Sequence, residues 1–216
     1  MKTFKQLIYT FTLFSVVLLT YHIIKSEELS YVFLVWNLFL AFIPWWISDY
    51  MKRQHKLTYI HLPIVLLWLL FLPNAPYILT DLFHLKPRPD LPLWYDLILV
   101  LSFALTGMMV FFKSLKDMLT LLNVRVGEFY VTIITPLLFW LVAYGLYLGR
   151  YLRFNSWDII HPFTLLKASF GILFEKDTIG FTGIFTVFMW FLFVMISKFN
   201  QHEIPTNKEF AANKHK

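Results

Sequence analysis

Six apolar runs constrain the fold of this chain more than any other feature of its sequence. They cover residues 7–24, 31–48, 57–71, 93–112, 129–148 and 179–197. A helix needs about 20 apolar residues to cross a hydrocarbon core of about 30 Å. Inside the bilayer a single apolar segment satisfies its backbone hydrogen bonds only as a helix. We therefore expect an all-α integral membrane protein with six transmembrane helices.

The composition leaves no room for a second, soluble domain. Of the 216 residues, 58% are hydrophobic and 15% are charged, whereas a soluble domain carries roughly 25% charged residues. We expect a single polytopic membrane domain over residues 1–197 and a polar cytoplasmic tail over residues 198–216. Residues 163–174 are too short to span, which predicts a short interfacial helix before the last span. Residues 113–128 either extend the fourth helix out of the membrane or lie along its surface.

The distribution of basic residues predicts the orientation. If the spans alternate in direction, twelve of the 19 Lys and Arg residues lie on the side of both termini and seven on the other. Positively charged loops stay in the cytoplasm, so we expect a multi-pass protein with both termini cytoplasmic. Because orientation accounts for the net charge of +6, we expect membrane lipid as the partner and no nucleic acid. The chain has no cysteine, which excludes thiol catalysis and thiolate metal sites.

Residues 72–85, LPNAPYILTDLFHL, combine two prolines with polar side chains at the edge of an apolar run. Pro73 and Pro76 each remove a backbone donor and disfavour helical geometry in the preceding residue, so the third span should break near residues 71–74. Asn74 can hydrogen-bond the released backbone groups, and Pro76 can start a new helix. That helix would carry four polar side chains at i, i+3, i+4 and i+7, hence on one face: Tyr77, Thr80, Asp81 and His84.

With alternating spans, three polar segments distant in sequence meet on the outer side of the membrane. Ten of their residues form the candidate site: Asn74, Tyr77, Asp81, His84, Asp96, Arg150, Arg153, Asn155, Asp158 and His161. Arg150 and Arg153 suit a phosphate or carboxylate, because a guanidinium binds such groups through two parallel hydrogen bonds. Asp81 and His84 are the candidate catalytic residues, and the others are candidate binding residues. No HExxH, paired-cysteine or DxDxD spacing is present, so we expect no metal site, and no cofactor is indicated.

The same residues also have structural interpretations. Asp81 and Asp96 can pair with Arg150 and Arg153 to hold three helices together. Asp96 also suits the N-terminus of its helix, where the backbone dipole favours a negative charge. Interfacial histidines are more often structural than ligands. Asn37, a lone amide in an apolar span, is expected to join two helices.

Three functional hypotheses remain open on these residues. The first is an outward-facing site that binds an anionic lipid headgroup or a small anion, with chemistry on a lipid or envelope substrate as one version. The second is a small-solute or ion-coupled transporter, because interrupted helices often flank substrate sites. The small size and the lack of an internal repeat argue against that hypothesis. The third is a structural or accessory membrane subunit whose polar cluster docks a partner.

Four sequence strings carry a resemblance to a known family. They are WNLFLAFIP at 36–44, LPNAPYILTDLFHL at 72–85, WYDLILVLSFALTG at 94–107 and YLGRYLRFNSWD at 147–158. In this order they resemble the bacterial multi-pass membrane-protein family catalogued as domain of unknown function 1361, over roughly residues 31–197. The resemblance implies a multi-pass protein of the bacterial cell (plasma) membrane. It implies no activity, since the family has none assigned.

Overall fold

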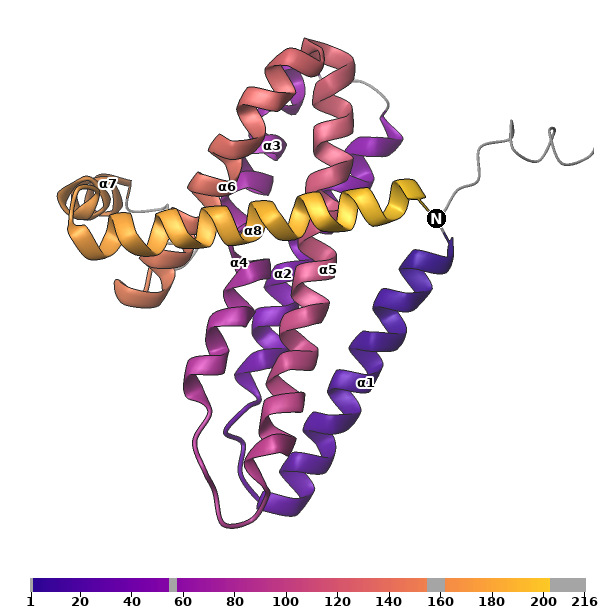
Figure 1. Ribbon diagram of the computed structural model, residues 1–216, viewed down its shortest axis with the longest axis vertical. Helices are drawn as coiled ribbons and strands as arrows, with labels where there is room; N and C mark the ends of the chain where they lie inside the picture. The colour runs from indigo at the N-terminus through magenta and orange to yellow at the C-terminus, as the bar shows by residue number, and fades with distance from the viewer. Residues whose placement is uncertain (1, 55–57, 155–161, 203–216) are drawn as a thin grey trace, which may run out of the picture.

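The computed structural model describes residues 2–54, 58–154 and 162–202, and all regular secondary structure in these ranges is helical (Figure 1). The long helices and short turns follow one another along the chain as α1 (Lys2–Ser26), α2 (Phe33–Arg53), η1 (Tyr59–His61), α3 (Leu62–Phe71), α4 (Asn74–Tyr77), η2 (Ile78–His84), α5 (Leu93–Val126), α6 (Glu128–Tyr151), α7 (Pro162–Ile172) and α8 (Lys176–His202). The η elements are 3₁₀ turns. The prediction of an all-α protein is confirmed for the described residues.

Five helical stretches among the described residues are long and apolar enough to cross a membrane. They are Phe4–Ser26, Tyr59–His84, Leu93–Val126, Glu128–Tyr151 and Lys176–Lys198, and each overlaps one of the six predicted spans. The remaining predicted span corresponds to α2, which has 21 residues but lower hydropathy, because its sequence contains Asn37, Pro44, Asp49 and several tryptophans. A multi-helix membrane fold is therefore confirmed with five candidate spans.

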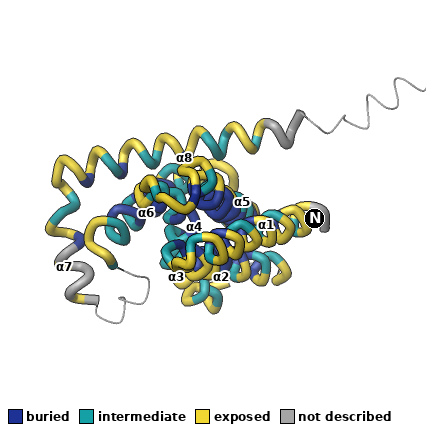
Figure 2. Tube along the Cα trace, turned by 90° about the horizontal axis from the view of Figure 1, so that it is seen from below, coloured by how far each residue is buried: buried dark blue, intermediate teal, exposed yellow. Residues whose placement is uncertain are grey.

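Helix α5 forms the centre of the bundle. It packs against α1, α2, α4, η2 and α6, and Figure 2 shows its buried residues at the middle of the end-on view. Its 34 residues include residues 113–126, so this segment extends the fourth span as a continuous helix. Gly127 ends the helix at φ 90°, a backbone conformation that glycine adopts without steric cost. The chain then reverses directly into α6.

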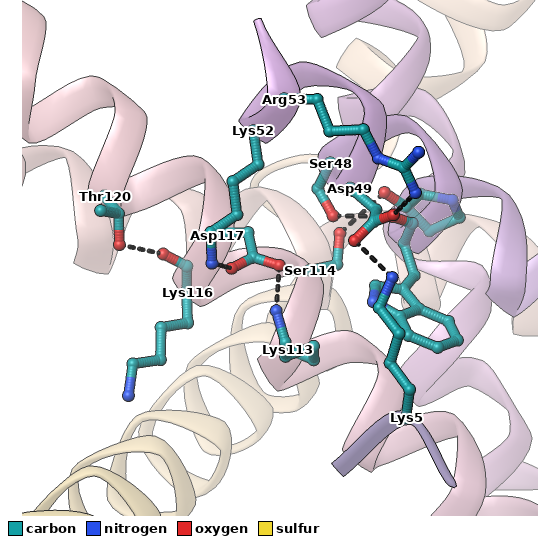
Figure 3. A network of polar contacts seen from close by, with 12 residues as sticks. Lys5, Ser48, Asp49, Lys52, Arg53, Lys113, Ser114, Lys116, Asp117 and Thr120 are labelled. Atoms are coloured by element: carbon teal, nitrogen blue, oxygen red, sulfur yellow. Dashed lines mark hydrogen bonds and ion pairs between the residues drawn. The ribbon is translucent and has the colours of Figure 1, made fainter. Parts of the chain in front are cut away.

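Two buried carboxylates lie far apart along α5. Asp96 is in its first turn and is fully buried. Asp117 is 2% exposed and pairs with Lys113 and, at 2.6 Å, with Lys52 Nζ (Figure 3). From Asp96 to Asp117 the helix rises about 32 Å at about 1.5 Å per residue. That length is close to the hydrocarbon core of a bilayer, about 30 Å.

The third span breaks at the prolines, as predicted, but it continues differently. Helix α3 ends at Phe71, and α4 begins at Asn74 rather than at Pro76. Residues Ile78–His84 then form a 3₁₀ turn instead of a new α-helix. The Thr80 hydroxyl donates to the Tyr77 carbonyl at 2.7 Å, a local bond that satisfies a carbonyl near the break. Because i and i+3 eclipse in a 3₁₀ helix, Asp81 and His84 share a face more closely than the predicted α-helix would allow.

Three glycines bring this broken segment close to its neighbours. A Cβ added at Gly107 would lie 2.5 Å from the Ala75 carbonyl oxygen, so only glycine lets α4 approach α5 this closely. The four-residue spacing of Gly145 and Gly149 predicts a close helix approach. In the structure their partner is again the broken segment, since an added Cβ at Gly145 would meet the Pro73 ring at 2.7 Å. The broken segment is thus packed closely between α5 and α6.

The last two helices depart from the direction of the bundle. Helix α7 lies where a short helix was predicted before the last span, and the Tyr144 hydroxyl of α6 donates to its Ser169 carbonyl at 2.5 Å. Helix α8 has the length and hydropathy of a span. However, it packs on α6 and runs across the bundle rather than along it, largely exposed (Figures 1 and 2). It also continues to His202, into the predicted tail, and the rest of that tail lies outside the described residues.

Candidate functional site

Asp81 lies at the junction of three elements. It is 1% exposed and belongs to η2. Its Oδ2 accepts a hydrogen bond from Asn37 Nδ2 of α2 at 2.9 Å. Its Oδ1 accepts a longer contact from Arg150 Nη1 of α6 at 3.5 Å. A buried carboxylate needs such partners, because an unpaired charge at this depth is costly.

Asn37 is the site residue that sequence reasoning missed. It was expected only to join two helices, and it does join α2 to η2, but through the central carboxylate of the site. The available signal was a lone amide inside an apolar span, a residue that must find a polar partner there. The choice of Asp81 as that partner depends on how α2 packs beside η2, which residue spacing does not show.

His84 and Arg150 form the second contact of the site. Arg150 Nη1 lies 3.0 Å from His84 Nε2. Because a guanidinium can only donate, Nε2 must accept, so the imidazole is neutral with its proton on Nδ1. Arg150 contacts both Asp81 and His84 through Nη1, which leaves Nε and Nη2 able to donate to an oxyanion. The guanidinium also lies over the Phe83 ring at 5.3 Å.

Asp81 and His84 line a pocket of about 420 Å³, whereas Arg150 contacts both of them but is not among the lining residues. The polar lining of this pocket consists of four residues of the predicted site and the newly identified Asn37: Asn37, Asn74, Tyr77, Asp81 and His84. Its apolar walls come mainly from α2 and α6: Phe33, Trp36, Leu40, Leu148 and Phe154. As predicted, Asn74 bonds the backbone at the break, donating to the Phe71 carbonyl at 2.9 Å. The pocket therefore combines hydrogen-bonding groups on one side with an apolar surface on the other.

Asp96 lies in a different cluster, on the α1 side of α5. Tyr31 donates its hydroxyl to Asp96 Oδ2 at 3.2 Å, and Arg88 Nε lies 3.7 Å from the same oxygen. His22 Nε2 is 3.4 Å from Oδ1. The structure thus brings Asp81, His84 and Arg150 together and leaves Asp96 with partners from α1 and two loops.

The C-terminal part of the predicted site is described only as far as residue 154. Arg153 follows the end of α6 in a left-handed conformation, φ 57°, is exposed, and is not among the residues that line the pocket. Asn155, Asp158 and His161 lie outside the described residues. Among the described residues no cluster of three His, Asp or Glu side chains could hold a metal ion.

The chemistry available to this arrangement follows from its donors and acceptors. Arg150 supplies a cation whose Nε and Nη2 groups bond neither Asp81 nor His84, His84 supplies a neutral imidazole, and Asp81 supplies a buried carboxylate held by Asn37. The apolar walls add surface for a hydrocarbon portion of a ligand. An amphiphilic ligand with a polar or anionic head fits both halves of the pocket.

Comparison with known proteins gives one match. The family model described as "Protein of unknown function (DUF1361)" matches residues 36–192, which include Asn37, Asp81, His84 and Arg150. No curated protein and no solved structure matches the chain. Because the matched region covers well over half of the 216 residues, the chain belongs to the DUF1361 family of proteins of unknown function.

Proposed function

We propose that this membrane protein binds the anionic headgroup of a lipid, or a small anion, in the pocket around Asp81. The observation that carries the proposal is the contact of Arg150 with both Asp81 and His84 beside a pocket with apolar walls. The pocket would open to the outer side of the plasma membrane, with both termini cytoplasmic, because positively charged loops stay inside. Membrane lipids and envelope precursors are the amphiphiles that reach this position.

Arg150 is the anion-binding group in this proposal. Its contact with Asp81 Oδ1 is long, at 3.5 Å, and both of its site contacts use one nitrogen. A phosphate can therefore bind Nε and Nη2 as a bidentate pair, the geometry that makes arginine–phosphate contacts strong. Asp81 keeps its hydrogen bond from Asn37 when Arg150 turns toward the ligand.

His84 and Asp81 are the candidate groups for chemistry on such a ligand. While Arg150 donates to Nε2, the lone pair of the imidazole is occupied. When a bound anion draws the guanidinium away, this lone pair becomes available to take a proton from a water or hydroxyl group. Asp81 would orient the bound group. A reaction on a lipid or envelope substrate is the version of the proposal that uses this step.

The binding test uses thermal unfolding of the purified protein in detergent, with dioleoylphosphatidate and inorganic phosphate as probes. A ligand at 100 times its Kd stabilises the folded state by about 2.7 kcal/mol. That is roughly 5–10 °C in Tm for a chain of this size. Phosphatidate should raise the Tm of the wild type, and Arg150→Gln should remove most of the shift. Arg125→Gln makes the same charge change at the other end of the α5–α6 pair, and it should leave the Tm shift unchanged.

Three outcomes decide between the hypotheses. A shift with phosphatidate but not with phosphate identifies a lipid, and equal shifts identify a small anion. An unchanged shift in Arg150→Gln refutes the proposed site. Asp81→Asn should accumulate and fold normally but respond less to the probe. If it fails to accumulate instead, the polar cluster is structural and the accessory-subunit hypothesis is favoured.

A transporter is the second candidate, favoured by one observation. The interrupted segment Leu62–His84 supplies Asn74, Tyr77 and Asp81 to the pocket, and interrupted helices often flank transport sites. Proteoliposomes with and without the protein can be compared for uptake of radiolabelled phosphate. Equal uptake with and without the protein would exclude phosphate transport, so that phosphate binding without transport remains.

A further inference from the structure

We propose that a second pocket, the groove between α5, α6 and α8, binds an anionic phospholipid of the inner leaflet with its phosphate on Lys116. The groove has a volume of about 420 Å³ and is lined by residues of these three helices. It shares no lining residue with the Asp81 pocket. The two sites are therefore separate, and both proposals use the same orientation of the chain in the membrane.

The groove is polar at one end and apolar at the other. Helices α5 and α6 run in opposite directions from Gly127, so positions equally far from that glycine lie at about the same height. Thr120, Asn123 and Thr132 line the end near the α5–α6 turn, and Phe139 and Phe193 line the other end. This order matches an inner-leaflet phospholipid, whose headgroup points toward the cytoplasm and whose acyl chains point toward the bilayer centre.

Lys116 is the groove residue of α5 farthest from Gly127, level with the start of the apolar end. It lies about as far from Gly127 as Phe139 does, and it lines the groove. Its side chain is exposed and makes no ion pair with any described residue. In Figure 3 it points away from Asp117, toward the side of α8. A lysine that has no ion pair among the described residues and that lies where the apolar wall begins is placed to bind a lipid phosphate.

The surroundings of Lys116 carry excess positive charge. Cations outnumber carboxylates in the neighbouring network (Figure 3), which consists of Lys5, Asp49, Lys52, Arg53, Lys113 and Asp117. Glu128 is the carboxylate among the groove residues, and it lies beyond Gly127. From Lys116 to the end of α5 the helix rises about 15 Å, more than the Debye length of about 8 Å at physiological salt. Glu128 therefore does not neutralise Lys116.

A phospholipid is the partner that satisfies both parts of the groove. Basic pockets between transmembrane helices on the cytoplasmic side bind anionic headgroups, each Lys or Arg near the surface contributing about fivefold in affinity. The apolar end needs a hydrocarbon partner, which a free phosphate lacks. A neutral phospholipid would fill the apolar end but leave Lys116 without an anion.

Trp190 lines the groove and provides the readout. The protein is reconstituted in vesicles of dioleoylphosphatidylcholine that contain increasing fractions of brominated phosphatidylglycerol or brominated phosphatidylcholine, whose bromines quench tryptophan on contact. The Trp190 signal is the difference between each protein and its Trp190→Phe counterpart. Brominated phosphatidylglycerol should quench this signal at about fivefold lower mole fraction than brominated phosphatidylcholine.

The variants separate charge recognition from simple lipid contact. Lys116→Gln should abolish the preference for brominated phosphatidylglycerol over brominated phosphatidylcholine, and Lys116→Glu should reverse it. Lys198→Gln, the same change at an exposed lysine of α8 outside the groove lining, should keep the preference, and so should Arg150→Gln at the Asp81 pocket. High salt should weaken the wild-type preference, since exposed charges are screened. Equal quenching by the two lipids in the wild type, or a preference that survives in Lys116→Gln, would overturn the proposal.

Discussion

Replacing Gly107 with alanine tests the contact that holds the broken third span in place. The added methyl group would lie 2.5 Å from the Ala75 carbonyl oxygen and 3.1 Å from Ile78 Cδ1. The first atom belongs to the backbone, so it cannot move aside as a side chain can. The segment is held on its other side by Pro73 against Gly145. The methyl group must therefore displace α4 or α5.

The expected loss of stability in Gly107→Ala is the difference between two opposing effects. Overpacking in a well-packed core costs about 1–3 kcal/mol, and a backbone clash at this distance belongs at the upper end. Alanine in place of glycine in a helix returns about 1 kcal/mol. The net loss is about 2 kcal/mol, which corresponds to a fall of roughly 4–8 °C in Tm for a chain of this size.

Gly183→Ala is the matched control. It is the same change in helix α8, where an added Cβ would meet nothing within 4 Å. Thermal unfolding in detergent, followed by circular dichroism, should show Gly183→Ala at or slightly above the wild-type Tm and Gly107→Ala well below it. If Gly107→Ala is as stable as Gly183→Ala, the reasoning that places the broken segment directly on the α5 backbone is refuted.

Two further predictions concern a buried hydrogen-bond chain and the orientation. The Ser114 hydroxyl accepts a hydrogen bond from Trp68 Nε1 at 2.8 Å and donates to the Pro44 carbonyl at 2.9 Å. Ser114→Ala leaves both of these buried groups unsatisfied and should lower the stability by about 1–3 kcal/mol. An unchanged Tm would show that the packing of α2, α3 and α5 does not depend on these two hydrogen bonds. Because the protein has no cysteine, Lys86→Cys introduces a single exposed thiol. A membrane-impermeant thiol reagent should label it in intact cells, and labelling only after lysis would place the Asp81 pocket on the cytoplasmic side.

Local chemistry made parts of the site predictable. Pro73 and Pro76 break the helix because of their own backbone geometry, and Asn74 bonds the Phe71 carbonyl three residues away. The spacing of Gly145 and Gly149 indicated a close approach without revealing what approaches. Each of these features depends on residues within one turn of each other, so the sequence contains the information.

Partners from distant segments were harder to predict. Asn37 and Asp81 are brought together by the packing of α2 beside η2. The pairing of Asp96 with Tyr31 and Arg88 depends on two loops at one end of the bundle. Several carboxylates and cations were available at the same predicted side of the membrane. Which of them pair is decided by the faces that the helices turn toward one another.

The sequence by itself determined that this chain forms apolar helices and where the third of them is interrupted, because hydropathy and proline geometry act locally. The tertiary structure alone decided that Arg150 contacts both Asp81 and His84 beside one pocket while Asp96 lies in another cluster. It also decided that α8, with the hydropathy of a span, runs across the bundle. Hydropathy shows that a helix is apolar enough for lipid, whereas its tilt is set by packing against its neighbours.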